Sequence, residues 1–167
     1  MNNKTEFVFD TCSSSVEGTI ARLTVADGIR LPLVVFIDNW ENVQVRHGQH
    51  CCIAVKGVGS NVKIFADENE YLATTPKTDV VSLIPTGEFM WHNNAETAEP
   101  YISFTGYVAE VDRDPDAGED APNYLLAVET LDMTFDVYLH YDGEISKGNV
   151  IHADAWIYGD LEPVGEG

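Results

Sequence analysis

The chain has 167 residues, of which 44% are hydrophobic and 22% are charged, and it carries a formal net charge of −19. This composition predicts a soluble globular protein with a substantial core. The longest apolar run, residues 31–37, is far shorter than the roughly 20 residues of a membrane-spanning helix. The first residues lack the pattern of a secretory signal, and three cysteines are too few for a disulfide framework. We therefore expect a cytoplasmic protein that does not enter membranes.

The negative charge is concentrated in the second half of the chain. Residues 96–167 contain 17 acidic and two basic residues, which leaves a charge of −15. Such a surface repels nucleic-acid phosphates and anionic lipids, and it attracts basic proteins. A basic protein surface is therefore the expected partner, and charge disfavours nucleic acid.

Short runs of alternating or β-branched residues recur from one end of the chain to the other. They are separated by Gly, Pro, Asn and Asp, and no segment shows a helical period with a convincing cap. We expect an all-β protein with a first unit at residues 1–66, a linker at 67–77, and a second, strongly acidic unit at 78–167. Within the second unit, residues 79–85 and 87–93 are predicted to be additional strands.

The two halves contain three similar blocks in the same order, which predicts an internal duplication. Glycines bound both members of the last block, and the offset between the halves grows along the chain as loop insertions would require. The blocks match residues 17–23 with 105–111, 33–45 with 125–137, and 48–59 with 148–159.

Two stretches, TGYVAEVDR (105–113) and GNVIHADAWIYGDL (148–161), resemble strands of the OB-fold, a small Greek-key β-barrel. The second stretch is similar to the glycine-led late strand of such barrels. The resemblance implies two OB-like β-barrel units in tandem. A single larger β-barrel and a β-sandwich are the alternatives, because strand counts alone do not separate these architectures.

The stretch HGQHCCIAVKGVG, residues 47–59, contains two histidines and two cysteines within six positions. Strand alternation places Cys51 on the core face and leaves His50 and Cys52 projecting together on the other. Two ligands do not make a tetrahedral zinc site, and His140 and His152 would complete one only if the halves packed suitably. We interpret the stretch as an ordinary strand, and we expect neither a metal nor another cofactor.

The second unit provides the expected binding residues. The strand at 148–159 should present Val150, His152, Asp154, Trp156 and Tyr158 on its outward face. The loop at residues 110–124 departs from an EF-hand, because Ala117 stands where the obligate glycine belongs. It is therefore interpreted as a solvated loop, with calcium binding as the alternative. Its expected partner-binding residues are Asp112, Asp114, Asp116, Glu119 and Asp120.

A single-stranded nucleic acid or an oligosaccharide is the alternative ligand, since OB-like barrels bind such chains through aromatic and basic side chains. The first unit would supply that face, with Trp40, Arg46, Lys56 and Lys63. The chain contains no nucleophile elbow, P-loop or dinucleotide fingerprint. We therefore expect a non-catalytic binding module. The favoured hypothesis is an acidic interaction protein of inhibitor or immunity type, although acidic residues are too abundant to exclude a carboxylate-based enzyme.

Overall fold

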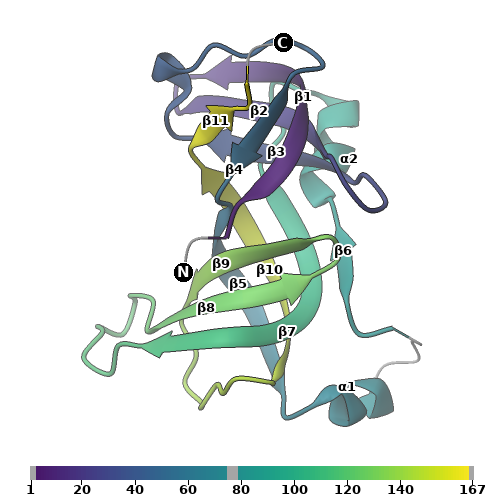
Figure 1. Cartoon of the computed structure of the whole chain (residues 1–167). Coiled ribbons are helices and arrows are strands. Elements are labelled where there is room, and N and C mark those ends of the chain that lie inside the picture. Colours follow the sequence, from purple (N-terminus) through teal and green to yellow (C-terminus); the bar gives the residue numbers. More distant parts are fainter. Residues whose placement is uncertain (1–2, 75–78, 166–167) are drawn as a thin grey trace.

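Eleven strands and three short helical segments make up the described residues, 3–74 and 79–165, of the computed structural model (Figure 1). The first half contains β1 (Thr5–Ser15), β2 (Gly18–Val25), β3 (Pro32–Ile37), η1 (Trp40–Asn42), β4 (His50–Ile53), β5 (Lys56–Phe65) and α1 (Glu68–Thr74). The second half contains β6 (Ser82–Ile84), α2 (Thr86–Asn93), β7 (Tyr101–Arg113), β8 (Tyr124–Thr130), β9 (Met133–Leu139), β10 (Val150–Gly159) and β11 (Leu161–Pro163). The all-β prediction is confirmed.

Five strands close into a barrel in the order β10, β5, β9, β8, β7 and back to β10. Strands β5 and β9 run parallel, and every other pair in the ring is antiparallel. This is a small closed barrel of OB-like type, as the resemblance implied. Its fifth strand, β5, comes from residues expected to belong to the first unit, so the barrel combines both halves of the sequence.

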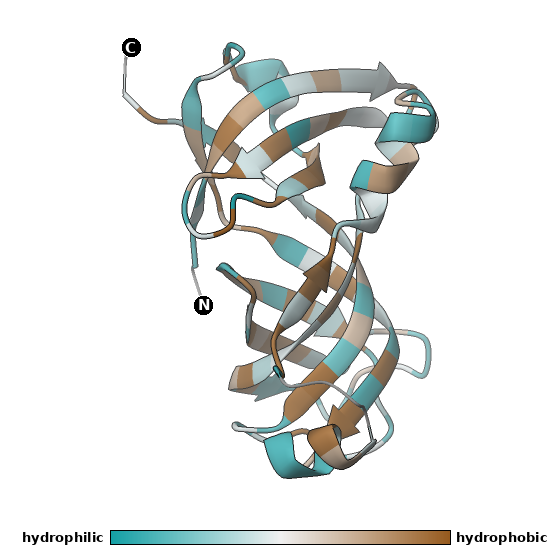
Figure 2. Ribbon diagram, turned by 90° about the vertical axis from the view of Figure 1, so that its right-hand side faces the viewer, coloured by the Kyte–Doolittle hydropathy of each residue, from teal (hydrophilic) through white to brown (hydrophobic). Residues whose placement is uncertain are grey.

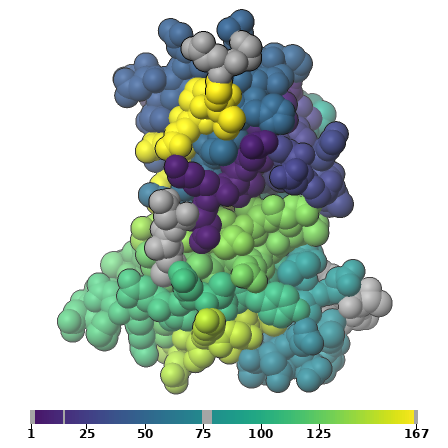
Figure 3. All heavy atoms as spheres, in the orientation of Figure 1, coloured from purple at the N-terminus to yellow at the C-terminus, as the bar shows by residue number. Residues whose placement is uncertain are grey.

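The remaining long strands form an N-terminal sheet in the order β11, β4, β1, β2, β3. Strand β3 pairs in parallel with the last residues of β10, and β11 continues from β10 after a single residue to pair with β4. The Asn39 side chain links β3 to this segment by accepting from the Leu161 N–H at 2.8 Å and donating to the Leu161 carbonyl at 3.0 Å. In Figure 3 the C-terminal atoms, in yellow, lie against the purple and blue atoms of the N-terminal sheet.

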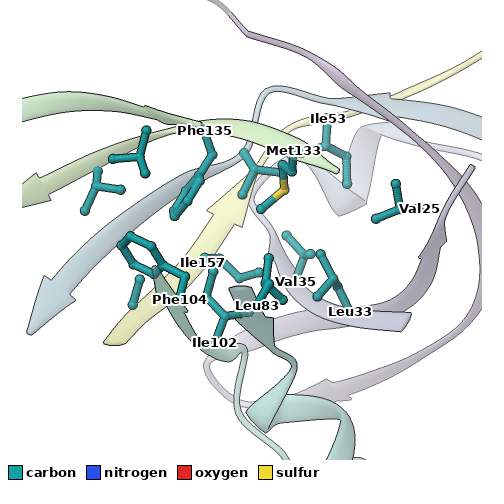
Figure 4. Close-up of a cluster of buried hydrophobic side chains, with 14 of the residues drawn as sticks. Val25, Leu33, Val35, Ile53, Leu83, Ile102, Phe104, Met133, Phe135 and Ile157 are labelled. Carbon is teal, nitrogen blue, oxygen red and sulfur yellow. The ribbon is translucent and has the colours of Figure 1, made fainter. Parts of the chain in front are cut away.

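One continuous core joins the barrel to the N-terminal sheet. The fully buried Phe7, Leu33 and Ile53 belong to the same cluster as Phe104 and Phe135, whose rings meet edge-to-face at 5.0 Å. Figure 4 shows Leu33, Ile53, Phe104 and Phe135 around Ile157 of β10, which lies between the two parts. Figure 2 shows the alternation of hydrophobic and hydrophilic residues along the long strands that produces this core.

Two glycine turns make the same contacts in the two parts of the molecule. Gly48 and Gly148 both have positive φ angles, 83° and 93°, which favour glycine. The Gly48 N–H donates to the Phe9 carbonyl at 2.8 Å, and the Gly148 N–H donates to the Val108 carbonyl at the same distance. The Gly48 turn therefore contacts β1 and leads into β4 in the same way as the Gly148 turn contacts β7 and leads into β10.

The segment between the two halves differs from the prediction. Residues 87–93, expected to be a strand, lie in α2, which packs against β3 and β7. The helix fits there because Gly87 has no side chain. A Cβ at this position would lie 2.5 Å from the Glu99 carbonyl oxygen. Of the predicted linker, residues 68–74 form α1 and residues 75–77 lie outside the described residues. Across the described residues, no helix is long and apolar enough to span a membrane.

Candidate functional site

A strip of aromatic and apolar side chains crosses the outer surface where β3, β10, β5 and β9 lie side by side. Trp156 lies 5.2 Å from Phe36 on β3 and 5.9 Å from Tyr158, measured between ring centroids. Val58 pairs with Trp156 across β10–β5 and with Tyr138 across β5–β9. We call these five residues, Phe36, Val58, Tyr138, Trp156 and Tyr158, the aromatic strip.

The strip faces outward because strand β10 alternates strictly. Ile151, Ala153, Ala155 and Ile157 are buried, whereas His152, Asp154, Trp156 and Tyr158 are only half-buried. Val58 is 47% exposed, so the centre of the strip is open to solvent. The predicted outward placement of Trp156 and Tyr158 is confirmed, whereas Val150, predicted on the same face, is fully buried because it packs with Tyr71 of α1 and with Val80.

Carboxylates outnumber cations around the aromatic strip. Burial and then the nearby Asp160 raise the pKa of Asp38, while Lys56 opposes them. Burial, with Tyr138 and Asp38 as neighbours, raises the pKa of Tyr158. The carboxylate of Asp154, two residues before Trp156, accepts a hydrogen bond from the Asn61 amide at 2.8 Å. Lys56 pairs with Tyr158 and brings a single positive charge to this surface.

A small cavity of about 50 Å³ adjoins one end of the aromatic strip, where the rings of Phe36 and Trp156 form part of its wall. Gly18 lies so close that a Cβ there would come within 2.6 Å of the Phe36 ring. The cavity is also lined by three exposed acidic residues from two separate segments, Glu17, Glu96 and Glu99.

The histidines and cysteines that attracted attention in the sequence do not gather into one site. As expected, Cys51 is buried, Cys52 is half-buried and His50 is exposed, with the His50 ring 2.9 Å from the Glu6 carboxylate. His152 lies 2.8 Å from the Thr105 hydroxyl on the barrel. Burial raises the pKa of the Cys51 thiol to about 12 and also raises that of Cys52, which disfavours a reactive thiolate. Among the described residues, no group of three or more His, Cys, Asp or Glu is placed to hold a metal ion.

The acidic loop, residues 112–120, begins with the last two residues of β7 and projects from the end of β7 and β8 (Figure 1). Its backbone is organised locally, with the Asp116 N–H donating to the Asp114 carboxylate at 3.1 Å. Its five predicted binding residues, Asp112, Asp114, Asp116, Glu119 and Asp120, are all exposed. They form a solvated, negatively charged projection, and none of them belongs to the aromatic strip.

The residues predicted for nucleic-acid binding are divided between two places. Trp40 stacks on Phe9 at 5.8 Å and lines, with Arg46, an open groove of about 880 Å³ beside the β3–β4 connection. Lys56 lies on the aromatic strip side of β5, and Lys63 pairs with His152 farther along that strand. The structure therefore provides no continuous line of cations through these four residues.

A buried ion-pair network was missed by the sequence reasoning. The Arg22 guanidinium donates to both oxygens of Glu88 on α2, with Nε–O distances of 3.0 and 2.8 Å, and also contacts Asp10. Glu88 is only 4% exposed, so the network fixes α2 on the outer face of β2. Because the helix was predicted as a strand, the sequence did not indicate this pairing. The one signal was Arg22, the single charged residue of β2.

A second missed residue is Asp136 on β9. It is only 7% exposed, and one of its carboxylate oxygens lacks a hydrogen-bond partner among the described residues. Burial raises its pKa, and Glu110 adds to the effect, while Lys56 and the Asn3 side chain oppose it. No sequence pattern distinguishes this aspartate from the exposed ones.

The arrangement is suited to binding, because an apolar surface with a charged border can be desolvated on contact with a complementary partner. Comparison with models of protein families and with curated protein sequences finds no match for this chain.

Proposed function

We propose that this protein is a non-catalytic binding module of the cytoplasm whose acidic surface docks on a basic protein. An inhibitor or immunity-type protein that neutralises a cationic enzyme is one concrete version. The observation that carries the proposal is the aromatic strip: a solvent-facing apolar surface with Asp38, Asp154 and Asp160 nearby and a single cation, Lys56. The three free cysteines, Cys12, Cys51 and Cys52, agree with a reducing compartment.

The two kinds of residue have different roles in this proposal. Aromatic side chains with a desolvated centre supply binding energy in protein interfaces, and Trp and Tyr are the commonest anchors. The distributed negative charge, including the acidic loop, accelerates encounter with a basic partner and suppresses anionic competitors. The strip therefore sets how long the complex lasts, and the charge sets how fast it forms.

An oligosaccharide or a single-stranded nucleic acid is the second candidate, supported by the groove beside Trp40. The groove is large enough for several residues of an extended chain, and Arg46 lies in it. Aromatic stacking would serve either ligand. A net charge of −19 weakens the case for nucleic acid, whereas it does not affect a neutral sugar.

We also propose that the chain is built from two OB-like units that exchange their fifth strands. The support is a pairing pattern that recurs: β1, β2, β3 and β4 pair with one another as β7, β8, β9 and β10 do. In each case the next segment of chain crosses over, with β5 entering the barrel and β11 joining the N-terminal sheet.

Two local details support the same correspondence. A register shift interrupts β1–β2 between Phe9 and Thr11, and β7–β8 between Val108 and Glu110, 99 residues later. The glycine turns at positions 48 and 148 lie 100 residues apart and make equivalent hydrogen bonds. Under this correspondence β1 matches β7, β2 matches β8 and β3 matches β9. The expected matchings of residues 17–23 with 105–111 and of 33–45 with 125–137 are therefore each displaced by one strand, while that of 48–59 with 148–159 is retained.

Affinity capture from cell lysate, with and without nuclease, tests the proposed function. We expect a basic protein to be retained after nuclease treatment and to be lost from a Trp156→Ala, Tyr158→Ala variant. Its association rate should fall as the Debye length shortens from about 30 Å at 0.01 M salt to about 8 Å at 0.15 M, while dissociation changes little. Neutralising the acidic loop should slow association further if the loop faces the partner.

A salt-independent association rate would contradict the electrostatic part of this proposal. Recovery of a nuclease-sensitive nucleic acid as the one bound species would favour the second candidate instead.

A further inference from the structure

The end of the aromatic strip that adjoins the small cavity has a more specific chemistry than the rest of the surface. The Trp156 and Phe36 rings meet there at an interplanar angle of 37° and form part of the cavity wall. A cavity of about 50 Å³ is well below the roughly 150 Å³ of a cavity that binds benzene. This space suits a charged side-chain head group and is too small for a whole aromatic ring or nucleobase.

The charges around this end favour a cation. Glu17, Glu96 and Glu99 line the cavity, and none of the other described residues that line it is basic. An aromatic face attracts a cation through its quadrupole, and a nearby carboxylate strengthens the attraction. A phosphate entering the same space would meet three acidic residues, so electrostatic repulsion excludes nucleic acid as the ligand at this end of the strip.

We propose that the aromatic strip and its adjoining cavity receive an arginine side chain of a partner protein, with the guanidinium against Trp156 and Phe36 and within reach of the cavity glutamates. Arginine fits better than lysine because its planar, weakly hydrated head group stacks on aromatic rings and donates to two acceptors at once. This inference rests on the proposed function, since it names the anchoring chemistry of the basic partner.

The first test uses two synthetic peptides, an alternating arginine–glycine octapeptide and its lysine–glycine counterpart, titrated into the full-length protein by calorimetry at low salt. The wild type should bind the arginine peptide about fivefold more tightly than the lysine peptide, the factor expected from one stacked cation. Equal binding of the two peptides would overturn the arginine assignment and leave only a general attraction between charges.

Variants then locate the contact. Trp156→Leu preserves apolar bulk and therefore the fold, but it removes the aromatic face. It should abolish the preference for the arginine peptide without unfolding the protein. Phe89→Ala is the matched control, because Phe89 is a 63% exposed aromatic residue on α2, outside the strip. The control should bind like the wild type. An arginine preference that survives Trp156→Leu would overturn the proposal.

A third variant separates the cavity from the general charge. Glu99→Gln should weaken arginine-peptide binding severalfold more than Asp116→Asn in the acidic loop, although both changes remove one negative charge. Equal effects would place the cation elsewhere. If the peptides bind without any arginine preference and a basic protein is still captured, the proposed function stands and this inference fails; if no cationic probe binds, both fail.

Discussion

The N-terminal sheet and the closed barrel treat their outward faces differently. On the N-terminal sheet, Arg22 of β2 is paired with the buried Glu88 of α2, and Val34 of β3 is 1% exposed close to Gly87 of the same helix. On the barrel, α1 covers β10 and β5 only at one end, where Tyr71 packs against Phe65 and Val150, and the other end of these strands carries the aromatic strip. Two similar strand arrangements thus differ in their surfaces, because the protein's own helix α2 occupies one face and the aromatic strip of the other is exposed to solvent.

The largest effect should come from the core that the two parts share. Phe7→Ala in the N-terminal sheet and Phe135→Ala in the barrel should each lower the free energy of unfolding by about 3–5 kcal/mol, because both rings are fully buried. Both variants should still unfold in one transition, since β5, β10 and β11 join the two parts. Urea denaturation followed by tryptophan fluorescence and far-ultraviolet circular dichroism measures this.

Two resolved transitions, with each variant shifting only one of them, would show that the two parts are independent. Phe89→Ala serves as the control and should change the free energy of unfolding by no more than about 0.5 kcal/mol, because this side chain is exposed.

The covering helix provides the next test. Arg22→Ala should lower the free energy of unfolding by about 3 kcal/mol, because it removes the guanidinium from the buried Glu88 carboxylate and leaves it with His92 as its remaining ion-pair partner. Lys4→Ala removes an exposed ion pair with Glu162 and should cost at most about 1 kcal/mol. Chemical denaturation of both variants gives the comparison, and equal losses would mean that Arg22 does not fix α2.

Asp136 tests whether the barrel contains a destabilising charge that the N-terminal sheet lacks. Its pKa is raised by burial, so the folded state favours the protonated acid, and stability should decline as the pH rises through the folded pKa. Asp136→Asn should therefore raise the free energy of unfolding by about 1 kcal/mol at neutral pH. The gain should vanish below the pKa of the unfolded aspartate, about 3.9. Denaturation from pH 3 to 8 measures it, and a pH-independent difference would contradict this explanation.

The smallest effect tests the equivalence of the two parts. Gly48→Ala and Gly148→Ala should each lower the free energy of unfolding by about 1 kcal/mol, because both glycines have positive φ angles that strain an alanine. A Cβ at either position would meet nothing within 4 Å, so no steric clash adds to this loss. Gly118→Ala is the control: its surroundings are also open, and its backbone lies outside the positive-φ region. If the losses caused by Gly48→Ala and Gly148→Ala differ by much more than the error of denaturant measurements, the two turns are not equivalent.

The sequence predicted features that depend on near neighbours. Alternation along 150–158 placed Trp156 and Tyr158 outward, and the same pattern placed Cys51 in the core. Pairing between distant strands could not be predicted in this way. Nothing in the residues of β5 shows that it pairs with β9 and β10 instead of closing a sheet with β1 to β4.

The covering helix illustrates the same limit. The segment GEFMWHN alternates enough to suggest a strand, and burial of Glu88 becomes favourable through Arg22, 66 residues earlier in the chain, together with His92 on α2 itself. The aromatic strip was predicted in part. Trp156 and Tyr158 share one strand, whereas Phe36, Val58 and Tyr138 join them only through strand pairing.

A fluorescence titration tests most directly whether the aromatic strip binds cationic rather than anionic partners. Trp40→Phe and Trp91→Phe leave Trp156 as the one tryptophan of the three in the chain. The arginine–glycine octapeptide should change its emission in a saturable way, and a mixed-sequence single-stranded oligonucleotide should leave it unchanged. A saturable response to the oligonucleotide, with none to the peptide, would contradict the account.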